Sequence, residues 1–343
     1  MAATLDARVE TTDRLGATDL DAVTRLVEAA TEADGLHPLS EHVMLHLRYG
    51  GEGLARHLLV FAHGEGEPER LAAYAHLDPT DAVEGSSAEI VVHPQLRRHG
   101  VGQLLVHSLE QASPDQRLRL WAHGQLVGAR AMAASLGYER ARELWQMRRL
   151  LYAPLPVVDL PAGYTVRTFT PGADDESWLA VNAEAFAHHP EQGSWDADDL
   201  HLRMAEPWFD PTGFLVLDAP DGTMAGFHWM KVHGGDHDGP LVAGPHAHEG
   251  HGHDPIGEVY VVGLAPGHQG RHLGRALTLA GLHHLRQLGL PQAMLYVDAD
   301  NSAAIRTYTS LGFTRWDVDA MFARPRRRAA LPDVHPPVTP SGA

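Results

Sequence analysis

Two short loops combine glycine with polar residues at a spacing that could hold a phosphate group. The first is Arg-Arg-His-Gly-Val-Gly at residues 97–102, and the second is Gln-Gly-Arg-His-Leu-Gly at residues 269–274. Each loop stands between a β-rich run and an apolar pattern with helical spacing, so backbone N–H groups and a helix N-terminus would point at a bound anion. One such loop alone is more simply an ordinary turn into a core helix. Two in register favour a pyrophosphate site, although His272 replaces the first glycine of the second loop.

The two loops belong to two copies of one sequence pattern. Pro94 before the first loop matches Pro266 before the second, and Leu-Gly-Tyr ending at Tyr138 recurs at nearly the same offset as Leu-Gly-Phe ending at Phe313. The glycine of each triplet stands where the end of a short helix needs a left-handed residue. The chain is therefore a tandem repeat.

Each copy predicts the same order of elements. A helix is followed by two β-rich runs, the strand before the loop, an amphipathic helix, a strand, a short helix and a last strand. This order indicates an α/β fold with a mixed sheet, built as two tandem domains. The predicted helices include residues 20–30, 102–111, 176–187 and 274–288, and the predicted strands include residues 58–62, 71–77, 143–150, 213–217, 225–232 and 317–323.

A proline-rich segment marks the boundary between the copies. Residues 153–163 contain prolines and end in glycine, which stops a helix and is typical of an extended linker. We therefore expect an N-terminal domain at residues 1–152 and a C-terminal domain at residues 164–325. The arginine- and proline-rich residues 326–343 are expected to be a disordered tail.

Composition excludes several classes of function. The 343 residues suffice for about two domains. Lys and Arg number 27 against 44 Asp and Glu, a net charge of −17, so neither nucleic acid nor an anionic membrane is an expected partner. We see no transmembrane segment or secretory signal and expect a cytoplasmic protein. The absence of cysteine excludes disulfides, thiolate metal sites and cysteine nucleophiles.

Histidine is over-represented, at 25 residues. A cluster lies in a Gly- and Pro-rich stretch, at His246, His248, His251 and His253. Its spacing matches neither helix-based nor finger-type metal ligands. We expect no metal site and a mobile loop here.

The loops and the Leu-Gly-aromatic triplets together resemble the acetyl-CoA-binding core of the Gcn5-related N-acetyltransferase (GNAT) family. This likeness covers both halves and implies two tandem GNAT-like acyltransferase domains. The tandem form is similar to the mycothiol acetyltransferase family, and the segments that carry this closer likeness lie in the second half at residues 182–193, 226–231, 257–264 and 295–308. Such an enzyme moves acetyl from acetyl-CoA, its co-substrate, to the free amine of the cysteinyl group of cysteinyl-glucosaminyl-inositol, giving mycothiol and CoA.

The resemblance assigns catalytic roles to two side chains. Amide formation needs a base for the amine proton, an acid for the leaving thiolate and a donor for the developing oxyanion. Glu258, at the start of the strand before the second loop, is the expected base, and Tyr308, on the short helix before Leu-Gly-Phe, is the expected acid. The alternatives are a surface or ion-paired glutamate and a core tyrosine.

The resemblance also implies binding residues. Acetyl-CoA would contact the first half through Ile90, Val91, Val92, Arg98, His99, Gly100, Val101, Gly102 and Gln103. In the second half it would contact Val262, Gly263, Leu264, Gln269, Gly270, Arg271, His272, Leu273, Gly274, Arg275, Asn301, Ser302, Ala303, Ala304, Ile305 and Arg306; Asn301 also suits a plain helix N-cap. The acceptor would contact Glu41, Glu191, Lys231, Glu258 and Tyr296, since carboxylates suit an ammonium and vicinal hydroxyls. A solvated helix start equally explains Glu41.

The two copies differ at the catalytic positions. At the offset of the proline pair, Glu258 falls on Ser86, and at the offset of the Leu-Gly pair, Tyr308 falls on Ala133. The first half keeps a phosphate loop without either proton-transfer group. We therefore expect it to hold acetyl-CoA without turning it over.

Two other functions fit parts of this pattern. The same chemistry could act on another small amine, such as an aminoglycoside, or on a protein N-terminus. A non-catalytic acetyl-CoA-sensing module would need neither Glu258 nor Tyr308. We expect a monomer whose partners are acetyl-CoA and a small-molecule amine.

Overall fold

The computed structural model describes residues 6–49, 54–64, 66, 68–80, 85–114, 117–187, 190–233 and 255–325. The side chains of residues 49, 190 and 191 are not described. The expected tail at residues 326–343 and the histidine-rich residues 246–253 lie outside this part of the chain. No helix in the described ranges is both long and apolar enough to cross a membrane.

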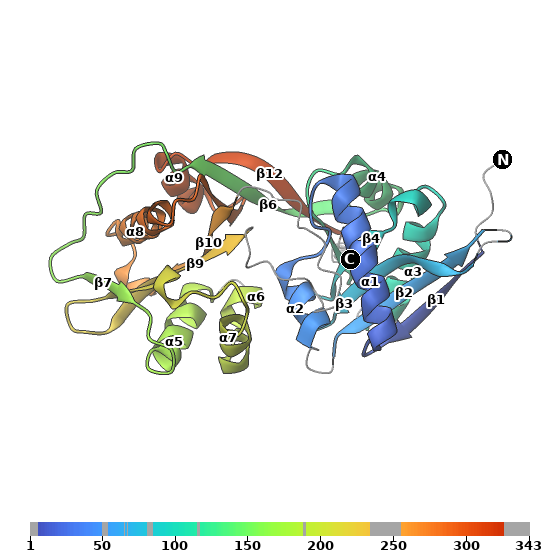
Figure 1. The fold of residues 1–343 in the computed structure, drawn as a ribbon, viewed down its shortest axis with the longest axis horizontal. Helices are drawn as coiled ribbons and strands as arrows, with labels where there is room; N and C mark the ends of the chain where they lie inside the picture. The colour runs from blue at the N-terminus through green and yellow to red at the C-terminus, as the bar shows by residue number, and fades with distance from the viewer. Residues whose placement is uncertain are drawn as a thin grey trace, which may run out of the picture.

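The strands of the described residues form one mixed sheet of twelve, in the order β1-β2-β3-β4-β5-β12-β6-β11-β10-β9-β8-β7 (Figure 1). The strands of the first copy are β1 (Asp6–Thr12), β2 (Arg56–His63), β3 (Arg70–Asp78), β4 (Ser87–Val92), β5 (Arg119–Ala122) and β6 (Glu139–Leu150). Those of the second copy are β7 (Thr165–Thr168), β8 (Phe214–Asp218), β9 (Met224–His233), β10 (Ile256–Leu264), β11 (Gln292–Asp298) and β12 (Thr314–Ala323).

Helices cover both faces of this sheet. The first copy carries α1 (Ala17–Asp34), α2 (Glu41–Tyr49), α3 (Val101–Ala112) and α4 (Val127–Ser135), with the short 3₁₀ helix η1 (Pro94–Leu96). The second copy carries α5 (Asp175–Ala185), α6 (Pro190–Gly193), α7 (Ala197–Met204), α8 (Leu273–Gln287) and α9 (Ser302–Ser310), with η2 (Pro211–Gly213) and η3 (Pro266–His268). The predicted α/β fold, the tandem repeat and each predicted helix and strand are confirmed.

Successive side chains of each strand enter different core clusters, so the core has a layer on each face of the sheet. On β2, Leu58 packs in the cluster that contains Leu105 of α3, whereas its neighbour Leu59 packs in the cluster that contains Val23 of α1. Successive side chains of a strand point to opposite faces, so the two helices lie on opposite faces of the sheet. The second half has an aromatic cluster around Trp178 and Trp229 on one face and an aliphatic one on the other.

The two halves exchange their last strands, as Figure 1 shows where β6 and β12 run side by side between them. β12 of the second copy pairs with β5 of the first, and β6 of the first copy pairs with β11 of the second. β6 and β12 also pair with each other, antiparallel. Each half therefore completes the sheet of the other. The division at residues 153–163 stays a prediction.

An ion pair joins each exchanged strand to its new neighbour. Arg142 of β6 binds Asp298 of β11 through two hydrogen bonds of 2.6 and 2.9 Å. Asp319 of β12 lies 3.1 Å from Nδ1 of His123, which follows β5. The cation is on the exchanged strand in one case and on the receiving half in the other. Opposite charges thus fix the strands in both halves.

The loops at residues 97–102 and 269–274, called the phosphate loops below, share one backbone conformation despite their different sequences. In the first, Arg98 and Gly100 have positive φ angles of 69° and 83°, and in the second, Gly270 and His272 have φ angles of 76° and 59°. Glycine and non-glycine have changed places between the two left-handed positions. Both loops lead directly into a helix, α3 or α8. His272 therefore preserves the loop geometry, and histidine is among the non-glycine residues more often found there.

We predict that Gly100→Ala lowers the free energy of unfolding by about 1–2 kcal/mol, because the Cβ of an alanine crowds its own backbone in the left-handed conformation. A Cβ at Gly100 would meet no atom within 4 Å, so crowding does not contribute. Gly267→Ala in η3 is the matched control, since it has the same open space and no positive φ. That control should be neutral or stabilising by up to about 1 kcal/mol. Denaturant unfolding measures both, and equal losses would contradict the explanation.

His76 of β3 is a buried histidine without a hydrogen-bond partner among the described residues. It is 2% exposed and lies opposite Glu89 in the register of β3 and β4. The corresponding pair in the second half is Trp229 of β9 opposite Val261 of β10. Burial, with the neighbouring His46 and His57, lowers the pKa of His76 to about 3. The first half thus places an imidazole with two unpaired nitrogens where the second half places an indole with one.

We predict that His76→Phe stabilises the protein, and more so at acid pH. The unfolded chain protonates this histidine near pH 6.5 and the folded chain only near pH 3, so folding stability is lost as the pH falls through that window. Relative to pH 7.5, His76 should account for a loss of about 2 kcal/mol at pH 5. Unfolding curves of both proteins at the two pH values measure the difference. An unchanged pH dependence in the variant would contradict the prediction.

Candidate active site

The two parallel strands beside the second phosphate loop, β10 and β11, separate from each other along their length. β10 and β11 are paired in parallel only from Ile256–Val259 and Gln292–Leu295, although β10 continues to Leu264. Residues 262–264 remain paired with β9 on their other side. Their backbone groups on the β11 side have no strand partner within the described ranges, so they can serve a ligand. In the first half, β4 and β5 are paired only from Ser87 to Glu89.

A β-bulge at Tyr260 shifts the register between β9 and β10. Val259 pairs with Met230 and Val261 with Trp229, which leaves Tyr260 as the extra residue. The first half has no register shift between β3 and β4. Counted along the strands from the shared proline, Glu258 therefore corresponds to Ser87 rather than to Ser86. The conclusion that the first half has a serine in place of the carboxylate is unchanged.

Glu258 is a nearly buried carboxylate, 7% exposed, directly opposite Lys231 of β9 in the strand register. Its Oε2 lies 2.5 Å from Nε2 of His233, which therefore fixes its orientation. His233 was not among the predicted site residues. The signal was available, because residues 231 and 233 of one strand point to the same face.

Tyr308 lies on α9, with its ring against Phe313 at a centroid distance of 5.9 Å. It is 8% exposed and makes no side-chain hydrogen bond to another described residue. Burial raises the pKa of the Tyr308 phenol to about 12. The group therefore keeps its proton at neutral pH. The backbone N–H of Phe313 donates to the carbonyl of Tyr308, and in the first half the N–H of Tyr138 donates to the carbonyl of Ala133 in the same way. Ala133 is therefore the counterpart of Tyr308 in the first half.

Lys231 forms an ion pair with Glu41 at the start of α2, so the first half reaches the second half's site. Burial alone would raise the pKa of Glu41, but the charge and hydrogen bond of Lys231, with the Tyr260 hydroxyl, lower it. The Lys231 ammonium also lies 4.6 Å from the ring centre of Trp208. Tyr260 and Trp208 were missed, because a bulge and a loop tryptophan carry no periodic signal.

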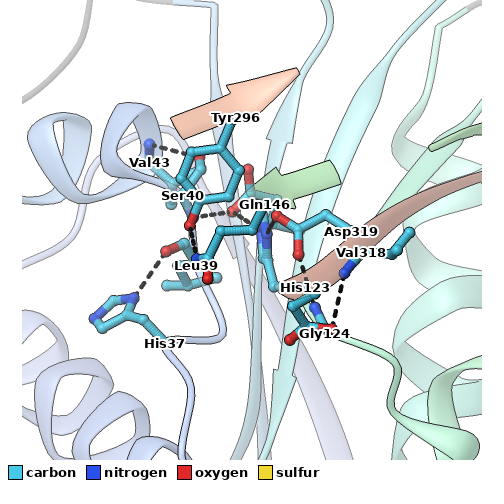
Figure 2. A network of polar contacts seen from close by, with 12 residues as sticks. His37, Leu39, Ser40, Val43, His123, Gly124, Gln146, Tyr296, Val318 and Asp319 are labelled. Atoms are coloured by element: carbon cyan, nitrogen blue, oxygen red, sulfur yellow. Dashed lines mark hydrogen bonds and ion pairs between the residues drawn. The ribbon is translucent and has the colours of Figure 1, made fainter. Parts of the chain in front are cut away.

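Tyr296 of β11 lies on the same face, 40% exposed. Its hydroxyl accepts a hydrogen bond of 2.8 Å from Gln146 of the exchanged strand β6, and the two side chains lie together in Figure 2. Burial and the nearby charge of Glu258 raise the pKa of Tyr296. The structure thus brings four of the predicted acceptor residues to one region. The fifth, Glu191, is in α6, where its side chain is not described.

The predicted cofactor residues lie at the end of β4 and β10 and in the segments that follow, and in the second half also after β11. Residues 90–92 and 262–264 end β4 and β10, residues 98–103 and 269–275 form the loops and the first turns of α3 and α8, and residues 301–306 begin α9. Oδ1 of Asn301 accepts the Ala304 N–H at 3.1 Å, so the N-cap interpretation is observed. Contact of these residues with acetyl-CoA stays a prediction.

No group of three or more metal-binding side chains among the described residues could hold a metal ion. The predicted absence of a metal site at residues 246–253 is untested, since they lie outside the described ranges.

Parallel strands that part beside a phosphate loop, with a carboxylate and a protonated phenol nearby, define an acyl-CoA-dependent transferase. The chain belongs to the acetyltransferase (GNAT) family, whose model matches residues 38–138 and 178–313. The family match in both halves confirms the tandem GNAT fold, the transferase activity and acetyl-CoA as co-substrate.

Several relatives carry a more specific name. The chain is 54% identical to a mycothiol acetyltransferase of Acidothermus cellulolyticus, covering 92% of this chain and 94% of the relative. It is 50% identical to one of Streptosporangium roseum, covering 93% and 100%. A solved GCN5-related N-acetyltransferase from Sphaerobacter thermophilus is similar in structure, with a TM-score of 0.63, 26% identity and coverage of 94% of this chain and 96% of that one. The resemblance seen in the sequence is confirmed.

We predict that Tyr308 stays protonated well above neutral pH. An ultraviolet titration of tyrosine ionisation should give the same curve for the wild type and for Tyr308→Phe up to about pH 11, because burial holds the pKa of Tyr308 near 12. One additional phenolate in the wild type below about pH 10 would show that the phenol is solvated, contrary to the structure.

Proposed function

We propose that this protein transfers the acetyl group of acetyl-CoA to the free amine of the cysteinyl group of cysteinyl-glucosaminyl-inositol, giving mycothiol and CoA. The choice of acceptor rests on one observation. About half of the residues, over more than nine-tenths of the chain, are identical to those of relatives named mycothiol acetyltransferase. The arrangement of Glu258, Lys231 and Tyr296 beside the parting of β10 and β11 supports the same reaction.

The chemistry follows from what each group can do. The amine nitrogen attacks the acetyl carbon once it has lost a proton, and Glu258 is the base that accepts this proton, directly or through water. Attack forms the C–N bond and a tetrahedral adduct, whose C–S bond then breaks. The departing thiolate takes the proton of the Tyr308 phenol, and the phenolate takes the proton that the amide nitrogen still has to lose, which restores the phenol. His233, at 2.5 Å from Glu258, holds the carboxylate in place during the transfer.

Backbone N–H groups of residues 262–264 are the proposed donors to the developing oxyanion, since these residues have lost their partner strand on the β11 side. Glu41, Glu191, Lys231 and Tyr296 are the proposed contacts of the acceptor. Carboxylates balance its ammonium group, and Tyr296 with Gln146 offers hydrogen bonds to hydroxyls.

The second half, residues 164–325, is the proposed catalytic domain, and the first half, residues 1–152, is proposed to bind acetyl-CoA without turnover. Ser87 and Ala133 stand at the positions of Glu258 and Tyr308, and neither can transfer these protons. The two loops nevertheless share their backbone conformation, which supports a cofactor site in each half. The cytoplasmic location and the monomeric state stay predictions.

The test is acetyl transfer by the purified chain to three amines: cysteinyl-glucosaminyl-inositol, an aminoglycoside and a peptide N-terminus. We expect the highest kcat/KM with the first. Mass spectrometry of the product is the suitable readout, because the acceptor's own thiol interferes with thiol reagents for CoA. Preference for either other amine would replace the proposed acceptor. No transfer to any of them, with acetyl-CoA still bound, would favour a sensing module.

We predict that Glu258→Gln lowers kcat by about 10²–10⁴-fold, because the amide cannot accept the amine proton. The matched control is Ser87→Ala at the corresponding position of the first half, which should leave kcat unchanged. Turnover near the wild-type rate in the Glu258 variant would refute the division of labour between the halves.

A further inference from the structure

The first half contains a buried carboxylate that the proposed reaction does not use. Glu89 of β4 is 8% exposed and lies two residues beyond Ser87, on the same face of the strand. Its Oε2 accepts the backbone N–H of Ser40 at 2.5 Å and lies 3.3 Å from Nε2 of His123. Glu89 therefore binds the residue that directly precedes α2.

A charged network holds Glu89 in place. His123 lies between Glu89 and Asp319 of the exchanged strand β12, and Figure 2 shows His123, Gly124 and Asp319 together. Burial opposes a charge on His123, but the hydrogen bonds to Asp319 and Glu89 raise the pKa of its imidazole to about 10. Burial likewise opposes the charge of Glu89, but His123 and Ser40 lower its pKa to about 2. Glu89 and His123 are therefore both charged at neutral pH.

The turn beside this network is packed against the segment that leads to α2. The backbone N–H of Gly124 donates to Asp319 at 2.8 Å, and Gly124 has a φ of 67°. A Cβ at this glycine would approach the Leu36 side chain to 2.4 Å. The Leu36 side chain therefore packs directly against Gly124, just beyond the end of β5.

Ser40 uses each of its polar groups at the start of α2. Its N–H donates to Glu89, its carbonyl accepts from Met44 at 3.0 Å, and its hydroxyl oxygen accepts from Val43 at 3.4 Å. The next residue, Glu41, forms the ion pair with Lys231 of the second half. Lys231 in turn stands opposite Glu258. Glu89 is thus connected to the proposed acceptor site through two consecutive residues, Ser40, which it binds, and Glu41, which binds Lys231.

We propose that Glu89 is a positioning residue for the second half's acceptor site: by binding the Ser40 N–H it sets the start of α2, and so places the Glu41 carboxylate on Lys231. This inference rests on the proposed function, because Glu41 and Lys231 are taken as acceptor contacts. The carboxylate of the non-catalytic half then acts on binding of the amine and not on binding of acetyl-CoA.

Ser40→Pro removes the N–H that Glu89 binds and leaves the buried pair of Glu89 and His123 intact. We expect the KM for the amine to rise about tenfold or more, the effect of one lost hydrogen bond to a charged group. The KM for acetyl-CoA should change by less than about twofold. Ser40→Ala is the matched control, because it keeps the N–H and loses only the hydroxyl, and its KM for the amine should stay near the wild-type value.

A second set of variants changes the acceptor of that hydrogen bond. Glu89→Ala should raise the KM for the amine, and Glu89→Gln, which keeps an oxygen for the Ser40 N–H, should restore much of it. Glu110→Ala is the control, since Glu110 of α3 binds Tyr138 of the same half and Arg324 at the end of the second half, and neither of these partners is in α2. Circular dichroism confirms that each variant is folded before its kinetics are compared.

The decisive measurement is a double-mutant cycle with Glu41→Gln. If Glu89 acts through Glu41, Ser40→Pro raises the KM for the amine in the wild-type background and adds nothing in the Glu41→Gln background. Effects that add in full, or that change the KM for acetyl-CoA as much as that for the amine, would overturn the proposal. Failure of the wild type to acetylate the amine would instead overturn the proposed function, so the two failures are distinguishable.

Discussion

The exchange of the last strands is the constraint on which both halves of this molecule depend. β6 of the first copy lies beside β11, and β12 of the second copy lies beside β5. Gln146 therefore meets Tyr296, and Asp319 meets His123, although each pair is far apart in the sequence. Neither half has a complete sheet without the other. The proposed acceptor site is consequently built from both halves, with Gln146 on the exchanged strand and Glu41 on α2.

Most of the elements could be predicted from the sequence, whereas the exchange could not. The order of elements in each copy predicts a last strand at residues 143–150 and at residues 317–323, and both strands are observed. That order contains no information about the partner strand, because the same segment fits the edge of either sheet. The ion pairs of Arg142 with Asp298 and of His123 with Asp319 select the partner, and they depend on positions that only the folded chain brings together.

The site was predictable to the extent that it follows the repeat. The repeat locates the loops, and comparison of the copies locates the two positions where the first half lacks a counterpart of Glu258 and Tyr308. A constant offset fails by one residue at Glu258, because the bulge at Tyr260 adds a residue to the second copy alone. His233 follows from the period of a strand, but Ser40 does not, since its role is a backbone N–H and any residue except proline supplies one.

Glu258 and Glu89, two buried carboxylates, are the proposed base of one half and the proposed positioning residue of the other. A general base works best when its pKa is near the operating pH. The hydrogen bonds of His123 and Ser40 outweigh the burial of Glu89 and lower its pKa to about 2, so the carboxylate holds an amine proton too weakly to serve as a base. The same interactions make Glu89 a firm anchor, because an ionised carboxylate binds an N–H more strongly than a neutral acid does. Loss of basicity and gain of positioning therefore have one physical cause, the imidazolium that Asp319 of the exchanged strand stabilises beside Glu89.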